Sequence, residues 1–207
     1  MVDPFPAYDV LAKRETPSWN ERTREVIDKR LALAIADKVL TAIQLMTLRA
    51  LVSCVCPEPP GRPGTTTVAM IVHKIAHDEG DGYRPASLPR AAECWRGGLD
   101  AIEDEARQRC RCAFAQLEAH SAEEILRAIA SGNVRSHLWK SLPASLFWQW
   151  RLLPDLVSSH WAQPSLWSAM GFGGPASPRG YVRLSENRRD PWEAAEQLRG
   201  PLRQHHG

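Results

Sequence analysis

Apolar residues recur at intervals of three and four along much of this chain, and this periodicity limits the folds open to it. The clearest case follows a Thr41–Gln44 capping pattern and ends before Pro57, with apolar residues at Ile43, Met46, Leu48, Leu51, Val52 and Val55. No run of alternating apolar and polar residues is long enough for a sheet, and no repeat of fixed period occurs. The sequence therefore predicts an all-α fold, a compact bundle of about six or seven helices.

Length and local composition divide the chain into three expected parts. At 207 residues it is long enough for one sizeable core, so residues 1–207 are expected to form a single helical domain. Prolines and scattered aromatic residues in 1–17 predict an extended N-terminal arm. Residues 18–169 are expected to form the helical body, and residues 170–207 an extended C-terminal segment rich in Gly, Pro and Trp.

Capping residues and helix breakers predict where the other helices begin and end. Ser18 with Glu21, and Ser121 with Glu124, resemble capping boxes at two helix starts. The run PEPPGRPG, residues 57–64, must be an exposed turn because it suits neither a helix nor a central strand. The remaining expected helices span 66–78, a long and partly exposed 88–112, and an aromatic 138–161 with Pro143 in its first turn and Pro154 dividing it.

The charge balance and hydropathy exclude several kinds of partner. The formal net charge is only +2, from 26 basic and 24 acidic residues, so a dedicated nucleic-acid binder is not expected. No run of about 18 apolar residues occurs, so membrane insertion is not expected either. Residues 1–15 lack a basic region followed by an apolar region, and the sequence therefore shows no recognisable secretory signal.

Two groups of titratable residues invite a chemical reading. His73 and His77 lie one helical turn apart, a spacing that allows two imidazoles to share a metal ion. No third ligand is evident nearby, so we expect a polar helix edge and no metal site. The acidic run Asp100, Glu103, Asp104 and Glu105 is expected to be a solvated helix face.

The five cysteines form an odd set with two CxC pairs, a spacing unlike that of zinc or thioredoxin-like motifs. We expect buried or free thiols without a catalytic role. A bond to a partner protein, or a meeting of the two CxC pairs in the fold, is the alternative. The cysteines are Cys54, Cys56, Cys94, Cys110 and Cys112.

The glycine-rich run from Met170 to Tyr181 resembles a phosphate-binding loop only superficially. No amphipathic helix follows it to bind an anion, and its two prolines remove backbone donors. A rigid, extended recognition segment is the better interpretation, with a purely structural loop as the alternative. No nucleophile elbow, dinucleotide fingerprint or Walker loop is present elsewhere, so catalytic residues are not expected.

The run GFGGPASPRGY, residues 171–181, resembles the C-terminal signature of the gluconate 2-dehydrogenase subunit 3 family. The resemblance begins with the HWAQPSLW stretch, residues 160–167, and continues to Trp192. Upstream, YDVLAKRETPSWN, residues 8–20, is similar to the opening of members that lack an export signal, and residues 81–99 match in character. Ser159 and Trp161 replace a tyrosine pair often found beside this break, so that contact is expected to differ.

The resemblance implies a compact helical, non-catalytic subunit that accompanies a large FAD-dependent dehydrogenase of the glucose-methanol-choline (GMC) type. The FAD and the chemistry would then belong to the partner, with a cytochrome c subunit as a further partner in some complexes. Cytoplasmic action is expected, and periplasmic delivery with a signal-bearing partner is the alternative. The residues expected to bind the partner are large aromatic groups and one arginine: Tyr8, Trp19, Trp161, Trp167, Phe172, Arg179, Tyr181 and Trp192.

Two other functions compete with this one. A stand-alone helical binding module or chaperone could hold a small ligand or an unfolded client in a groove between helices. A metal- or thiol-dependent enzyme would instead use the histidine and cysteine pairs. The sequence does not identify the substrate of a complex, its electron acceptor or its stoichiometry.

Overall fold

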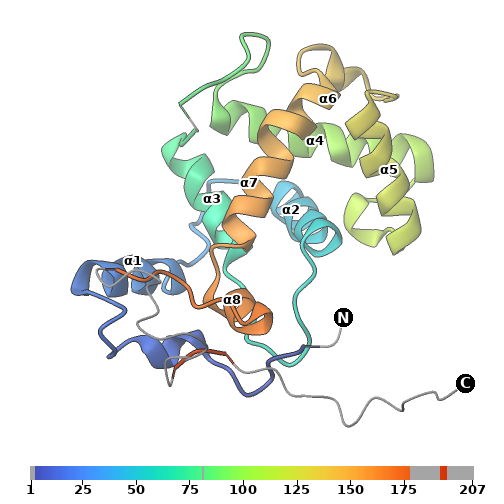
Figure 1. Cartoon of the computed structure of the whole chain (residues 1–207). Helices are drawn as coiled ribbons and strands as arrows, with labels where there is room; N and C mark the ends of the chain where they lie inside the picture. Colours follow the sequence, from blue (N-terminus) through green and yellow to red (C-terminus); the bar gives the residue numbers. More distant parts are fainter. Residues whose placement is uncertain (1–2, 81, 178–191, 195–207) are drawn as a thin grey trace, which may run out of the picture. The chain divides into compact units, whose positions relative to one another are not determined.

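The computed structural model describes residues 3–80, 82–177 and 192–194, and in these ranges the chain is all-α, as predicted (Figure 1). Among these residues the only strand-like pairing is an isolated parallel bridge between Trp19 and Ser177. No helix within the described ranges combines the length and the apolar character needed to cross a bilayer.

Backbone contacts group the chain into two compact units. Unit 1 comprises residues 1–31, 58–64 and 163–207, and unit 2 comprises residues 32–57 and 65–162. The single domain expected from the sequence stays a prediction, and each unit is described by itself below.

The core of unit 2 is built around α4 (Ala91–Cys110), which packs against α2 (Ala42–Val55), α3 (Thr67–His77) and α5 (Ala119–Ser131). The predicted capping box of α2 is confirmed, because Thr41 and Gln44 exchange both side-chain to backbone hydrogen bonds. As predicted, α4 is long and partly exposed: Glu93, Arg96, Asp100 and Arg107 are exposed on one face. The other face buries Ala91, Cys94, Trp95, Gly98, Leu99, Ala101, Ile102, Glu103, Glu105 and Ala106.

Gly98 explains how an aromatic ring reaches the backbone of α4. The Phe147 ring lies so close that a Cβ at position 98 would be 2.3 Å from Phe147 Cζ. The same ring meets Trp95 edge-on, with ring centroids 5.9 Å apart and an interplanar angle of 83°. Removing one side chain from the helix thus lets two large aromatic residues share the centre of the core.

Two carboxylates of α4 contradict the prediction of a solvated acidic face. Glu105 is fully buried and accepts hydrogen bonds from the backbone N–H groups of Arg135 and Ser136 at 2.8–3.0 Å. Glu103 is 6% exposed and accepts from Thr47 Oγ1 and the Phe114 N–H. Both carboxylates are hydrogen-bonded, as buried polar groups normally are. Their donors come from other segments of the chain, so the sequence of α4 alone did not predict this burial.

The aromatic C-terminal region of unit 2 is divided as predicted, but through a π-helical turn. It runs through the 3-10 helix η3 (His137–Lys140), α6 (Ala144–Phe147), the π-helix η4 (Trp148–Leu152) and α7 (Leu153–His160). The Leu153 N–H donates to the Trp148 carbonyl, a five-residue step that widens the helix just before Pro154. Such a turn accommodates a proline, which has no N–H to donate.

Two predicted helix caps are wrong. α1 (Glu21–Leu31) begins after Asn20, whose side chain accepts from the Thr23 N–H at 2.9 Å, whereas Ser18 is buried. α5 begins at Ala119, before the Ser121 that was expected to cap it. Asn is as good a cap as Ser, so local preference alone did not decide between the candidates.

Unit 1 contains the 3-10 helix η1 (Val10–Lys13), α1 and α8 (Pro164–Met170) around a small core of Val10, Trp19, Ile27 and Trp167. The prediction that residues 1–17 form an extended arm is therefore incomplete, because their described part includes η1. Asp9 is the N-cap of η1, and its side chain accepts a hydrogen bond from the Leu11 N–H. Arg62, in the predicted turn 57–64, donates to the carbonyls of Phe5 and Tyr8 and holds this region in place.

Candidate functional site

The segment that follows α8, Gly171–Ser177, is the first candidate surface for a partner. α8 ends at Gly171, which takes the left-handed conformation with φ +68°. The Phe172 N–H then donates to the Trp167 carbonyl at 2.8 Å, which completes a Schellman-type helix end. This turn fixes the backbone of Phe172 while its side chain stays 45% exposed.

Residues 173–177 are held against the N-terminal part of unit 1 by hydrogen bonds to the backbone. Lys13 Nζ donates to the Gly173 carbonyl, and Trp19 Nε1 donates to the Pro175 carbonyl at 2.8 Å. Ser177 closes the segment, because its N–H donates to Ser18 and its carbonyl accepts from Asn20, both at 2.8 Å. The described part of the glycine-rich run is thus a fixed, extended segment, as its proline content predicted.

Gly174 lies directly against the core of unit 1. It has φ +64°, and a Cβ built there would lie 3.0 Å from the Trp167 ring and 3.2 Å from Val10 Cγ2. The segment can therefore lie against the indole only because position 174 has no side chain.

The residues predicted to bind a partner differ in how exposed their side chains are. Trp19 and Trp167 are buried, at 2% and 5% exposed, and are core residues of unit 1. Tyr8 and Trp192 are half-buried in the same unit. Arg179 and Tyr181 lie outside the described residues, so their placement stays a prediction.

Phe172 in unit 1 and Trp161 in unit 2 are the two predicted residues with large exposed faces. They are 45% and 46% exposed respectively. Phe172 stands edge-on to the buried Trp167 at a centroid distance of 6.1 Å, and Trp161 stands edge-on to the buried His160 at 5.7 Å. Each exposed ring is thus supported from behind by a buried one, which limits its rotamers and the entropy lost on binding.

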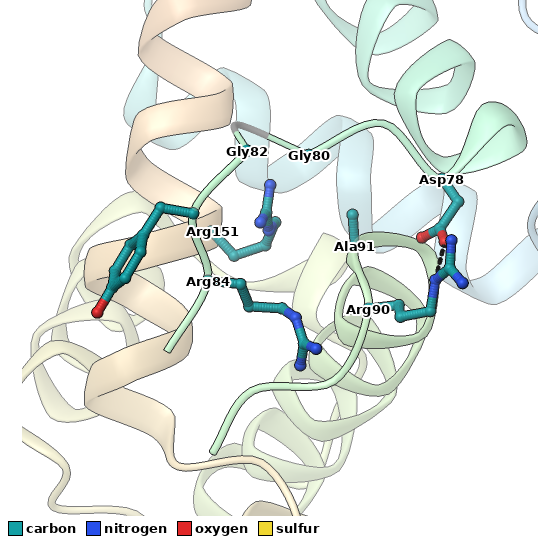
Figure 2. A pocket seen from close by; sticks show the side chains of 8 residues that line it. Asp78, Gly80, Gly82, Arg84, Arg90, Ala91 and Arg151 are labelled. Carbon is teal, nitrogen blue, oxygen red and sulfur yellow. Dashed lines mark hydrogen bonds and ion pairs between the residues drawn. The ribbon is translucent and has the colours of Figure 1, made fainter. Parts of the chain in front are cut away.

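Unit 2 contains a cationic pocket that the sequence analysis did not identify. It has a volume of about 290 Å³ and is lined by Asp78, Gly80, Gly82, Tyr83, Arg84, Arg90, Ala91 and Arg151. Figure 2 shows Arg84 and Arg151 on the side of the pocket away from the Arg90–Asp78 ion pair. The signal in the sequence was the pair of arginines that flanks PASLP, residues 85–89, but the third arginine comes from η4, more than sixty residues later.

The charges in this pocket are only partly neutralised. Asp78 pairs with Arg90, and the Ala92 N–H together with this arginine holds the pKa of the Asp78 carboxyl below its usual value. Asp155 pairs with Arg151 at 3.3 Å and with Lys74 at 2.9 Å. Arg84 donates to the Leu88 carbonyl and has no carboxylate partner among the described residues. The pocket can therefore accept an anionic group from outside.

The five cysteines are free thiols, which agrees with the prediction. Cys56 and Cys94 are buried, and burial raises the pKa of each thiol to about 11. Thiols with such high pKa values are protonated near neutral pH and are weak nucleophiles. Their placement in the core of unit 2 is that of small apolar residues.

Comparison with protein families identifies the family of this chain. Residues 42–174 match the family described as gluconate 2-dehydrogenase subunit 3, which covers most of the chain from α2 to the Gly174 contact. The chain belongs to this family. No curated protein and no solved structure matches it. The expected family is therefore confirmed, whereas the resemblances at residues 8–20 and 175–192 lie outside the matched range and stay predictions.

Proposed function

We propose that this member of the gluconate 2-dehydrogenase subunit 3 family is a non-catalytic small subunit that stabilises and assembles a large FAD-dependent dehydrogenase of the GMC type. In this proposal FAD is bound by the large subunit, and a cytochrome c subunit can complete the complex. The compartment proposed is the cytoplasm, with export alongside a signal-bearing partner as the alternative. Family membership supports association with a dehydrogenase, and the docking role rests on the geometry of residues 171–177.

The single observation that carries the proposal is the exposed Phe172 on an otherwise fixed segment. Its backbone is set by the helix end at Gly171, and the following residues are held by Lys13 and Trp19. A large apolar side chain whose backbone is already ordered loses little conformational entropy when a partner covers it. Aromatic residues of this kind are the ones that dominate binding energy when they become fully desolvated.

The cationic pocket of unit 2 supports the same proposal by a different interaction. Its Arg84, which pairs with no carboxylate among the described residues, offers a planar guanidinium that suits a carboxylate. Charges at the rim of an interface mainly accelerate association and fix the orientation of the partner. We therefore propose that Phe172 supplies binding energy and that Arg84 guides an acidic group of the dehydrogenase.

A subunit of this kind would stabilise its partner by mass action. Binding to the folded dehydrogenase and not to its unfolded chain adds about 2.7 kcal/mol of stability when the free subunit is at 100 times its Kd. No catalytic group of this chain is needed for that effect.

Quantitative capture of the dehydrogenase tests the proposal. The tagged chain is expressed in its native host, and the captured flavoprotein is measured for the wild type, Phe172→Ala and a control, Val26→Ala. Val26 is a matched control because it is also in unit 1 and is 42% exposed. Loss of a desolvated aromatic anchor costs about 2 kcal/mol, so Phe172→Ala should weaken capture roughly 30-fold while the control retains it.

Two results would contradict the proposal. Equal capture by Phe172→Ala and Val26→Ala would show that Phe172 does not contribute to binding of the dehydrogenase. Stoichiometric flavin and turnover in the purified chain alone would show that it is itself an enzyme.

A further inference from the structure

We propose that His73, His77 and Glu79 form a zinc-binding site at the C-terminal end of α3. The three side chains each offer a ligand atom, and these atoms all lie within 4.8 Å of one another. The site lies wholly within unit 2 and does not depend on the proposed docking role. No third ligand was expected from the sequence, and Glu79 supplies one.

The two histidines have the spacing of a helical metal-binding pair. They lie four residues apart on α3, and their rings stack with centroids 4.1 Å apart and an interplanar angle of 29°. His77 Nδ1 lies 2.9 Å from the His73 carbonyl oxygen, which can only accept a hydrogen bond. The neutral His77 ring must therefore carry its proton on Nδ1 in this contact, and Nε2 is left with the lone pair that binds a metal.

The end of α3 brings Glu79 back toward His73. Asp78 takes the left-handed conformation with φ 52°, and the Glu79 N–H donates to the Lys74 carbonyl at 2.9 Å. With the Asp78 N–H directed to the Ile75 carbonyl, this is a Schellman motif, which turns the chain back over the last helical turn. Glu79 Oε1 consequently lies 3.9 Å from His73 Nδ1.

A zinc ion fits after side-chain movements. Zinc–nitrogen and zinc–oxygen bonds of about 2.0–2.2 Å at a tetrahedral angle place two ligand atoms about 3.4 Å apart. The ligand atoms, which lie within 4.8 Å of one another, must close to that separation, and for His73 Nδ1 and Glu79 Oε1 the change is roughly half an ångström. Both side chains are free to make this change because they are 42% and 52% exposed.

The end of the helix itself favours a cation at this place. The C-terminal end of a helix carries partial negative charge from its unpaired carbonyl groups. The nearest cationic side chain on the same turn, Lys74, pairs instead with Asp155 at 2.9 Å. Asp78 is already bonded to the Ala92 N–H and to Arg90, so it does not compete as a ligand.

The donor set indicates zinc. Two imidazole nitrogens and one carboxylate oxygen are borderline ligands that suit Zn²⁺ and leave a fourth position for water or for a side chain of another protein. Binding would join α3 to the start of the loop that contains Gly80 and Gly82, two residues that line the cationic pocket.

Titration of the purified, tag-free chain with zinc tests this site. His77→Ala should weaken zinc binding at least about tenfold, and Glu79→Gln should weaken it by a smaller factor. His120→Ala is the matched control, because His120 also lies on an exposed helix face beside a carboxylate, Glu124, at 3.4 Å. The control should bind zinc like the wild type.

Cobalt substitution separates this site from the cysteines and from the two adjacent histidines His205 and His206. The expected spectrum is that of a nitrogen- and oxygen-ligated ion without thiolate charge transfer, unchanged when both terminal histidines are replaced by alanine. The proposal is overturned by a thiolate band, by loss of binding in the terminal variant, or by wild-type affinity in His77→Ala. Wild-type affinity in Glu79→Gln would equally overturn the three-ligand site.

Discussion

Replacing Gly174 with alanine should destabilise the packing of residues 171–177 against the core of unit 1. Two costs combine at this position. The backbone has φ +64°, which disfavours a residue with a side chain by about 1–2 kcal/mol. The added Cβ would also lie 3.0 Å from the Trp167 ring and 3.2 Å from Val10 Cγ2.

The steric cost follows from how well these neighbours are packed. Trp167 is 5% exposed and Val10 is fully buried, so neither can move without disturbing the core of unit 1. Overpacking of this kind costs about 1–3 kcal/mol. The expected total is therefore about 2–5 kcal/mol.

Gly61 provides the matched control. It is in the same unit and has φ +76°, but a Cβ there would meet nothing within 4 Å. Gly61→Ala should therefore cost only the conformational part, about 1–2 kcal/mol. The difference between the two variants isolates the contact of Gly174 with the core.

Hydrogen exchange of the Ser177 amide is a suitable assay, because this N–H donates to the Ser18 carbonyl at 2.8 Å only while the segment is in place. Each 1.4 kcal/mol of lost local stability should accelerate its exchange about tenfold. Exchange in Gly174→Ala should exceed that in Gly61→Ala by about one order of magnitude or more. Equal rates in the two variants would refute the close packing of this segment on Trp167.

Three further predictions concern unit 2. Glu105→Gln should destabilise the chain by about 2–4 kcal/mol at neutral pH in chemical denaturation. Burial raises the Glu105 pKa, but hydrogen bonds from Ser136, Arg109 and Arg135 outweigh it and lower the pKa overall. The stability that Glu105 contributes is therefore present above its unfolded pKa and is lost as the pH falls through the lower folded pKa. Glu105→Gln should lose this dependence of stability on acid pH. In the same denaturation experiment, Gly98→Ala should cost several kcal/mol because its Cβ would lie 2.3 Å from Phe147 Cζ. Gly97→Ala is the control: the nearest atom to its Cβ would be 3.9 Å away, so it should stabilise α4 by about 0.5–1 kcal/mol. At pH 8, alkylation of Cys94, whose pKa is about 11, should be far slower than that of the exposed Cys110, and comparable rates in peptide mapping would contradict the buried placement.

The parts of the fold that depend on local sequence were predictable. The Thr41–Gln44 capping box, the end of α2 before Pro57 and the end of α5 at Gly132 all follow from residues within one turn of the helix end. These signals act through the backbone of the same segment, so no knowledge of the tertiary structure was needed.

The burial of Glu103 and Glu105 could not be predicted for the opposite reason. A run of carboxylates on a helix is normally solvated, and only donors brought from elsewhere make its burial favourable. For Glu105 these donors are the N–H groups of Arg135 and Ser136, about thirty residues later. The sequence around Glu105 does not indicate that these N–H groups lie beside it.

The candidate site shows the same limit. Aromatic residues in the C-terminal signature suggested a contact surface, but the sequence does not distinguish a tryptophan that faces a partner from one that completes the chain's own core. Trp167 and Phe172 are only five residues apart, and the first is buried while the second is 45% exposed. Glu79 was missed because helical periodicity stops at His77, and the left-handed Asp78 then redirects the chain.

Under the proposed function, the segment Gly171–Ser177 has two roles that are thermodynamically coupled. It contributes the Gly174 contact to the core of unit 1, and under the proposed function it also presents Phe172 to the dehydrogenase. The apparent Kd equals the intrinsic Kd divided by the fraction of molecules in which the segment is in place. Gly174→Ala should therefore weaken capture only after local stability has fallen far enough to lower that fraction, whereas Phe172→Ala should weaken capture with the segment still in place. Deleting the whole segment cannot separate the two effects, because it removes the support of Trp167 together with the docking side chain. The two point variants do separate them. Gly174→Ala should accelerate Ser177 exchange more than it weakens dehydrogenase capture, and Phe172→Ala should weaken capture while Ser177 exchange stays unchanged.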